Sequence, residues 1–303
     1  MDPSLLVTWV LVPAAAGYAL AAPSLLRRRH ARQGLPRWTR LVDLPVPRDA
    51  GPTIASHLTA RRVGCDVGGA AAVAVTALWG VTLGGGATIS SWWPIVLLSS
   101  LFVGAAIGGA IGAFRAATRP IAGDAVRVAR STVARLEDYV APLERWAARL
   151  VAVSPVVVLI AVLAAPNGAV VAGPVSAAAA SVLVLAVAEV GARAVLRGRQ
   201  PAGSDLELAW QDAIRAQALR SILGVPVAVG VYACAAALSA LEPGQLDPRG
   251  AGAVALIASA TLVIAAGAAL LLWTNGPRPH QHFRQQLWPD AGPPLAPPVG
   301  EGR

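Results

Sequence analysis

The feature of the sequence that most constrains its fold is a series of apolar blocks, each about as long as a bilayer is thick. A helix needs roughly 20 apolar residues to cross the hydrocarbon core of a membrane. We predict seven spans, at about residues 5–22, 64–84, 93–114, 150–165, 169–191, 221–241 and 250–273. The expected fold class is therefore an all-α membrane protein with seven transmembrane helices.

The distribution of basic residues predicts the orientation of these spans. All 25 basic residues are arginines, and 24 of them fall in four segments: 27–62, 115–149, 193–220 and 278 onward. Only Arg249 lies on the other side of the predicted membrane. Because arginine is retained on the cytoplasmic side, we expect the N-terminus outside and the C-terminus in the cytoplasm. An odd number of spans is required, and seven satisfies it.

Composition excludes several function classes. Only 14% of the residues are charged, against roughly a quarter in an average soluble domain. The absence of lysine removes Walker A loops and lysine Schiff bases, and direct search finds no HExxH, CxxC or GxSxG motif. We therefore expect no catalytic residues, no cofactor, no metal site and no nucleic-acid partner, which favours a protein that is not an enzyme.

The domain organisation follows from the same blocks. Residues 1–275 form a single polytopic membrane domain with cytoplasmic helices at about 124–149 and 204–220. Residues 276–303 are rich in proline, which disfavours a regular helix. We expect them to form a disordered cytoplasmic tail.

The helix expected at 124–149 has coiled-coil spacing, since its apolar residues alternate in steps of three and four. Pro142 lies inside the pattern and is expected to kink or divide the helix near Val140. Two alternatives remain: self-association through this helix, or plain packing and contact with the membrane surface.

The helix expected at 204–220 begins with Ser204 and Glu207, which form a capping box. Leu206, Trp210 and Ile214 recur every four residues and give an apolar stripe. Such a helix either lies in the membrane interface or packs on the cytoplasmic ends of the spans.

Ionisable side chains near membrane depth are candidate functional residues because their burial is expensive. Glu189 and Arg193, and likewise Arg62 and Asp66, are four residues apart, the spacing at which two helical side chains meet. We expect local pairing within each set, with a proton-handling or substrate role as the alternative.

Two further patterns concern lipid and packing. Arg27, Arg28, Arg29 and Arg32 follow the first span directly, where they either fix the topology or bind anionic headgroups. Gly104, Gly108 and Gly112 repeat every fourth residue inside the third span. Such a stripe allows helix backbones to approach closely, either in a homo-oligomer or against a sister helix of the same chain.

The stretch Asp205-Leu206-Glu207-Leu208-Ala209-Trp210-Gln211-Asp212-Ala213-Ile214-Arg215, together with the lysine-free Ala/Val/Arg-rich blocks, carries one resemblance. In these features the chain resembles the uncharacterised multi-span membrane proteins of high-GC actinobacteria. The resemblance implies a location in the bacterial inner membrane and supplies no catalytic residues.

The function expected from the sequence is that of a non-enzymatic accessory or scaffold subunit. Its expected partners are membrane lipids, anionic at the cytoplasmic face, and a second copy of the chain or a membrane partner subunit. One alternative is a small transporter or channel-like permease built on the proline-bearing spans, at Pro155, Pro174 and Pro226. The second is an intramembrane enzyme acting on lipids through Glu189 and Asp66.

Overall fold

The computed structural model describes residues 35–46, 51–83, 93–118, 134–163, 172–198, 200, 202, 204–239, 258, 261–267, 269–270 and 277–289. Regular structure within these ranges is helical throughout. The helices are α2 (Gly51–Leu83), α3 (Trp93–Ala117), α4 (Leu136–Tyr139), α5 (Pro142–Leu163), α6 (Ala172–Arg197), α7 (Asp205–Ser239) and α9 (Pro277–Leu287). Residues 35–42 and 261–267 are also helical.

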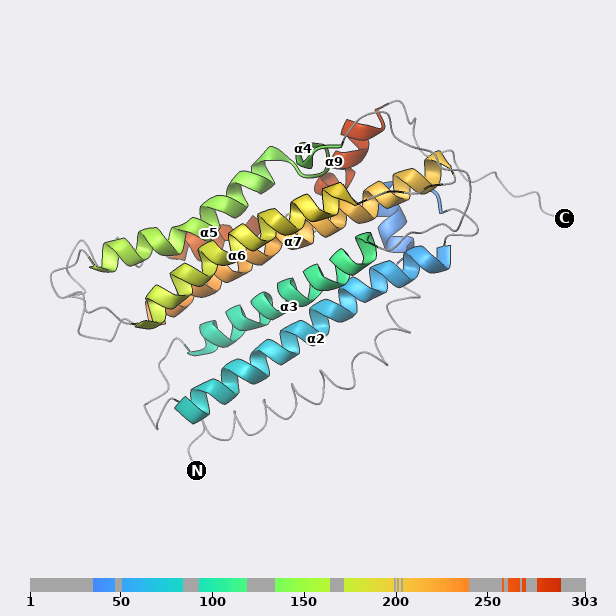
Figure 1. Cartoon of the computed structure of the whole chain (residues 1–303). Helices are drawn as coiled ribbons and strands as arrows, with labels where there is room; N and C mark the ends of the chain where they lie inside the picture. The colour runs from blue at the N-terminus through green and yellow to red at the C-terminus, as the bar shows by residue number, and fades with distance from the viewer. Residues whose placement is uncertain are drawn as a thin grey trace.

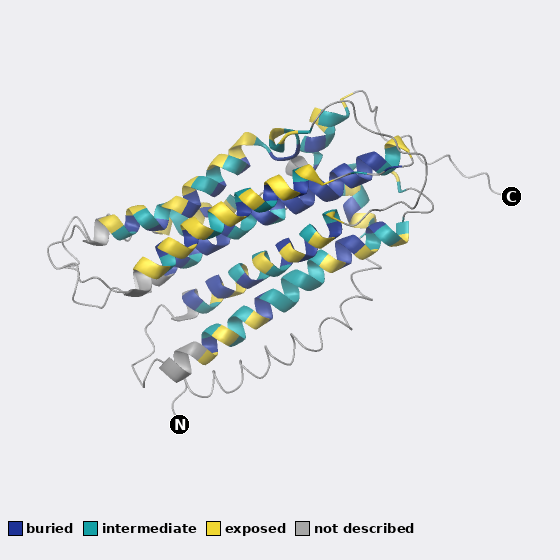
Figure 2. Cartoon of the chain, in the orientation of Figure 1, coloured by how far each residue is buried: buried dark blue, intermediate teal, exposed yellow. Residues whose placement is uncertain are grey.

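Helix α7 lies at the centre of the bundle. It packs against α3, α5 and α6, while α2 packs on the outer side of α3 (Figure 1). Burial agrees with the central position of α7. In its most apolar stretch 72% of the residues are buried, whereas in the most apolar stretch of α6 only 22% are buried (Figure 2). Helix α6 therefore presents apolar side chains outward, including Leu183, Val187 and Val190, as expected for a surface that faces lipid.

Among the described residues, three helices are long and apolar enough to cross a membrane. The qualifying segments are Val96–Ala117, Val175–Arg197 and Asp205–Ala235. This supports an all-helical membrane protein, at a coarser level than the seven spans expected. The span predicted at 5–22 lies outside the described residues, as do parts of the one at 250–273.

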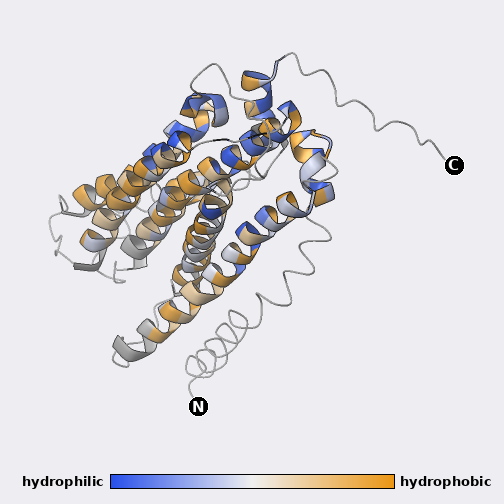
Figure 3. Ribbon diagram, turned by 45° about the vertical axis from the view of Figure 1, so that its right-hand side comes forward, coloured by the Kyte–Doolittle hydropathy of each residue, from blue (hydrophilic) through white to orange (hydrophobic). Residues whose placement is uncertain are grey.

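The polar residues of the bundle gather at one end (Figure 3). Helix α7 has 35 residues and is about 52 Å long at roughly 1.5 Å per residue. The hydrocarbon core is only about 30 Å thick, so one end of α7 must extend well beyond it. We call that region of the molecule the polar end; it comprises residues 35–46, 51–62, 115–118, 134–149, 193–198, 204–220 and 277–289.

The glycine stripe of α3 packs against α2 of the same chain. A methyl group at Gly108 would overlap the carbonyl oxygen of Gly64, and one at Gly104 would overlap that of Gly68. At Gly112 an added Cβ would lie 2.6 Å from the carbonyl oxygen of Ala60. The stripe was expected to pack either in a homo-oligomer or against a sister helix of the same chain, and the structure shows the second. Helix α2 covers the three glycines, so they are not free to contact a second copy.

The helix expected at 124–149 is not continuous. Val140 is extended, with φ −129° and ψ 124°, and it separates α4 from α5. The predicted division near Val140 is confirmed, because Pro142 begins α5, at a position where its missing N–H is not needed. Helix α5 then runs without a break past residue 150, so the end of the expected cytoplasmic helix and the start of the expected fourth span belong to one helix. Residues 124–133 lie outside the described ranges.

The helix expected at 204–220 is also not a separate element. It is the first half of α7, which continues into the expected sixth span. Capping by Ser204 is confirmed, since its Oγ accepts a hydrogen bond from the Glu207 N–H at 3.3 Å. Trp210 and Ile214 are buried against the rest of the chain, so this stripe does not lie in the membrane interface.

The expected disordered tail contains a docked helix, which is a further correction. Helix α9 begins at Pro277, and prolines in a first turn cost no internal hydrogen bond. Phe283 is 1% exposed and joins the largest apolar cluster of the polar end. Burial of the Phe283 side chain in this cluster helps to stabilise α9 although its prolines have a low helix propensity.

Candidate functional site at the polar end

The core of the polar end is a helical segment with polar residues on every side. Each residue from Leu208 to Arg220 is buried, including the charged Asp212, Arg215 and Arg220. Buried charges are costly unless they are paired and hydrogen-bonded. The chain therefore has to supply partners for them, and these come from segments far away in the sequence.

Asp212 is fully buried and accepts three hydrogen bonds. The Tyr139 hydroxyl donates to Oδ1 at 2.9 Å, and Gln200 Nε2 donates to the same oxygen at 3.0 Å. Trp288 Nε1 donates to Oδ2 at 3.0 Å. One carboxylate thus joins α4, the segment before α7 and the residue after α9. Burial raises the pKa of Tyr139, as does the adjacent carboxylate, so Tyr139 remains a donor at neutral pH.

Arg215 and Trp210 fasten two further segments to α7. Arg215 Nη2 donates to the carbonyl oxygen of Gly198 at 2.6 Å, and its guanidinium lies 6.0 Å from the ring centroid of Tyr139. Trp210 Nε1 donates to the carbonyl oxygen of Pro45 at 2.8 Å. These bonds satisfy buried donors and hold the chain around α7.

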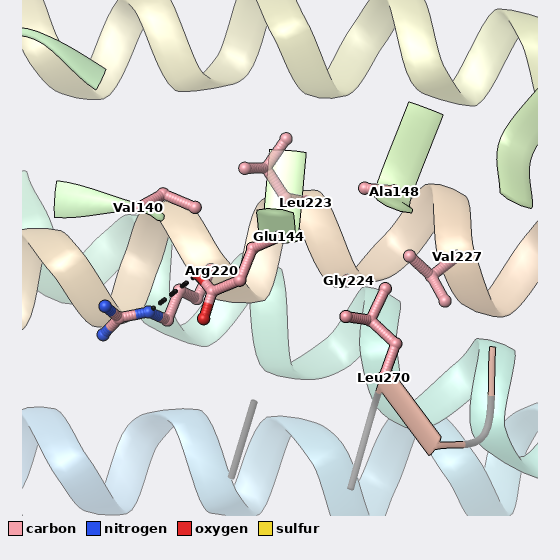
Figure 4. A pocket seen from close by; sticks show the side chains of 8 residues that line it. All are labelled: Val140, Glu144, Ala148, Arg220, Leu223, Gly224, Val227 and Leu270. Atoms are coloured by element: carbon pink, nitrogen blue, oxygen red, sulfur yellow. Dashed lines mark hydrogen bonds and ion pairs between the residues drawn. The ribbon is translucent and has the colours of Figure 1, made fainter. Parts of the chain in front are cut away.

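Arg220 and Glu144 form a buried ion pair. Arg220 Nε lies 3.2 Å from Glu144 Oε2, and Nη2 donates to the carbonyl oxygen of Tyr139 at 2.9 Å. Figure 4 shows the pair at one side of a small cavity whose other walls are apolar, with Val227 and Leu270 among them. Burial raises the pKa of Glu144, and Arg220 opposes that shift. Glu144 Oε1 has no hydrogen-bond partner within the part of the chain that the structure describes.

A second cavity, of about 90 Å³, also borders Arg220. Its polar lining residues come from α2, α7 and α9, and they are Arg61, Cys65, Gln217, Arg220, Ser221 and His280. Arg61 Nε donates to Ser221 Oγ at 2.9 Å. Both cavities therefore border Arg220, one apolar and one lined by hydrogen-bond donors.

His280 closes the second cavity from the side of α9. It is 7% exposed and contacts Trp38 edge to face, with ring centroids 4.8 Å apart. Burial, together with the charges of Arg220 and Arg61, lowers the pKa of His280 to about 3. The imidazole is therefore neutral at pH 7, and its Nδ1 has no hydrogen-bond partner among the described residues.

Helix α9 is held over the polar end by contacts along its length. Arg284 pairs with Asp43, whose φ is +54°, and it donates to the carbonyl oxygen of the same residue at 2.6 Å. His282 Nε2 lies 2.9 Å from the carbonyl oxygen of Glu137. These contacts fix the position of His280 at the cavity.

The local pairing expected for Glu189 is wrong in its partner. Glu189 accepts hydrogen bonds from Arg149 of α5, at 2.9 Å from Nε and 2.7 Å from Nη2. Arg193 is exposed on the next turn of α6. Both Arg149 donors share one oxygen of Glu189, Oε1, and these charge-assisted bonds join α5 to α6.

Asp66 and Arg62 both lie on α2 and are half-buried. Burial and the cations Arg37 and Arg61 lower the pKa of Arg62, whereas Asp66 raises it, so the two charges interact. Helix α2 packs chiefly on α3, and α6 packs on α5 and α7. The structure therefore does not bring Asp66 and Glu189 together as one site.

Other sequence-predicted features fall into three groups. Arg27, Arg28, Arg29 and Arg32 lie outside the described residues. Pro155 and Pro226 lie inside continuous helices, so neither provides the unwound backbone expected of a broken transporter helix. Over the described ranges, no three His, Cys, Asp or Glu side chains are grouped to hold a metal ion.

The polar core is made by Tyr139, Glu144, Asp212 and Arg220, none of which was predicted from the sequence as a functional residue. One signal was present, because the polar residues of 208–220 occur on all faces of the helix and not on one. A helix of that kind needs partners all around it.

The chain was compared with known proteins. No family model, no curated protein and no solved structure matches it. Its function is therefore argued from its own residues.

Proposed function

We propose that the protein is a seven-span inner-membrane protein that serves as an accessory or scaffold subunit, with the polar end in the cytoplasm. The observation that carries this proposal is the enclosed polar core. The carboxylates Asp212, Glu144 and Glu189 all bond to groups of their own chain. Such interactions stabilise a fixed shape, as a structural subunit requires.

The arrangement of the described helices supports the proposed topology. Val263 and Ile264 reach the cluster that contains Cys234, whereas Leu270 lines a cavity with Gly224 and Val227, so this segment runs antiparallel to α7. It returns toward the polar end, where α9 follows. Under this proposal the α2/α3 and α5/α6 hairpins, α7 and this returning segment would be the six later spans, and the span predicted at 5–22 would be the seventh.

Reporter fusions test this topology. A reporter active only in the periplasm should be active when fused after Leu241 and silent when fused after Arg197. The reverse pattern would overturn the proposed orientation, and activity at both positions would overturn the number of spans.

An exposed apolar ridge on the first turns of α5 supports contact with another subunit. Leu143, Trp146 and Leu150 are all exposed and share one face by their spacing of three and four. They lie where α5 leaves the predicted span, with the Arg149 guanidinium 5.4 Å from the Trp146 ring centroid. Exposed aromatic residues and arginines such as these are enriched at protein–protein interfaces.

The accessory role is tested by native mass spectrometry of the full chain extracted gently from its own membrane. We expect a partner subunit of fixed stoichiometry, or a homo-oligomer, that is lost in Trp146→Ala and retained in Leu183→Ala. Leu183 is the matched control because it is equally exposed but belongs to α6, in the middle of a span. A bare monomer would contradict the proposal, and one that retains a small solute would favour transport.

A further inference from the structure

The strongest unassigned feature is the cavity of about 90 Å³ between α2, α3, α7 and α9. About 10–15 Å³ of volume by this measure is enough to hold one water, so the space admits several waters or a small polyatomic ion. The surrounding helices approach closely here, since Gly109 and Gly224 also line it.

The charge around this cavity is not balanced by the described residues. Arg220 has Glu144 as its carboxylate partner, but Arg61 is bonded to the neutral Ser221 hydroxyl. Arg61 and Arg220 both line this partly open space, and Glu144 neutralises the charge of Arg220, whereas no ion pair to Arg61 is seen among the described residues. An anion in the cavity would offset the remaining charge.

The uncharged lining groups are suited to the same ligand. The Gln217 amide and the Ser221 hydroxyl can donate hydrogen bonds, and both line the space. His280 is more than nine-tenths buried, and its Nδ1 lacks a partner in the described structure. A neutral imidazole can donate through one ring nitrogen, so the cavity offers donors from several directions.

The behaviour of His280 indicates the sign of the electrostatic potential. Arg61 and Arg220 each contribute to lowering the pKa of His280, after the larger effect of burial. The field that disfavours a positive charge on the imidazole favours a negative charge beside it. The donor set and the potential, which both arise largely from Arg61 and Arg220, point to the same class of ligand.

We propose that the cavity bordered by Arg61, Arg220 and His280 binds a phosphate-type oxyanion. Guanidinium groups match the geometry of phosphate oxygens and bind them through paired donors. The same chemistry has two sources at a membrane surface, free inorganic phosphate and the phosphodiester of a phospholipid headgroup. This inference goes beyond the proposed accessory role and does not depend on it.

The test uses the full-length protein, purified in detergent and stripped of lipid. One arm measures equilibrium binding of radiolabelled inorganic phosphate. The other reconstitutes the protein in nanodiscs of phosphatidylglycerol and phosphatidylcholine, and counts by native mass spectrometry the lipids retained after release. Saturable binding in the first arm identifies free phosphate, and one retained phosphatidylglycerol per chain without phosphate binding identifies a headgroup.

Variants decide whether the cavity is responsible. Arg61→Gln should weaken binding by about tenfold or more, because it removes a charged donor. Gln217→Met, which keeps the charge and the approximate volume, should weaken it several-fold and decides the question if Arg61→Gln does not fold. Arg149→Gln removes an arginine of the polar end that lies away from the cavity, and it should bind like the wild type. Absence of saturable binding in both arms, or equal binding by Arg61→Gln and the wild type, would overturn the proposal.

Discussion

The Tyr139 hydroxyl donates a hydrogen bond of 2.9 Å to Asp212, a residue 73 positions later in the chain, and both side chains are fully buried. Gln200 and Trp288 donate to the same carboxylate. The position of α4, of the segment before α7 and of the residue after α9 therefore depends on one acidic group.

Removing the Tyr139 hydroxyl should destabilise the polar end. Tyr139→Phe leaves the buried Asp212 with one donor fewer, which costs about 1–3 kcal/mol. Thermal unfolding in detergent measures the loss. Tyr232→Phe is the matched control, since the described part of the chain provides Tyr232 with no hydrogen-bond partner, and its midpoint should be within a degree or two of the wild type. Equal losses in the two variants would contradict the role given to Asp212.

The contact between α2 and α3 should not tolerate a methyl group. Gly108→Ala places its Cβ against the carbonyl oxygen of Gly64, and overpacking of this kind costs about 1–3 kcal/mol. Gly191→Ala is the control, because its Cβ would lie 3.8 Å from Ile222 Cγ2, an ordinary contact. Alanine stabilises a helix relative to glycine by roughly 0.5–1 kcal/mol, so the control should unfold at the same or a higher temperature. A Gly108→Ala protein as stable as the wild type would show that the helices are farther apart.

Features that depend on neighbouring residues could be predicted from the sequence, whereas features that depend on tertiary contacts could not. The helical class, the Ser204 cap and the division at Val140 follow from neighbouring residues, and all three were predicted. The glycine stripe of α3 predicted a close contact, but its partner depends on Gly64 and Gly68, which repeat at the same spacing in α2.

The polar core could not be predicted in the same way. Glu189 has an arginine four residues away on its own helix, yet its partner is Arg149, 40 residues earlier. Which arginine pairs with it depends on how α5 packs on α6, and no local pattern specifies that. Likewise, Pro277 and Pro279 indicated a disordered tail, because the docking of Phe283 is a tertiary contact that overrides weak helix propensity.

The partner of Glu189 can be identified by double-mutant cycles. Substitution of Glu189 and Arg149 by glutamine, singly and together, should give a coupling energy of about 0.5–1 kcal/mol, the range of partly exposed pairs. The cycle between Glu189 and Arg193 should give a value near zero, because Arg193 is exposed and makes no ion pair with Glu189 in the structure. Unfolding in detergent provides all the required free energies. A larger coupling with Arg193 than with Arg149 would restore the local pairing.

The burial of neutral His280 should make stability depend on pH. Its pKa falls from 6.5 to about 3 on folding, because of burial and of Arg220 and Arg61. Between these values the unfolded chain binds a proton that the folded chain does not, so the free energy of unfolding decreases as the pH falls below about 6.5. The stabilising contribution is fully present above that pH.

Between about pH 7.5 and about pH 5.5, this effect should cost the wild type roughly 1.4 kcal/mol, the equivalent of one pKa unit. His280→Gln should lose less stability over the same interval, and His282→Gln, which changes a partly exposed histidine of the same helix, should behave like the wild type. Burial raises the pKa of Glu144, which gives a pH dependence of opposite sign. That contribution is common to the wild type and His280→Gln, so it cancels when these two proteins are compared. In His282→Gln the pKa of Glu144 loses the lowering effect of His282, so the comparison of the wild type with His280→Gln is the decisive one. Identical differences in the wild type and His280→Gln would mean that His280 is not held neutral beside Arg61 and Arg220.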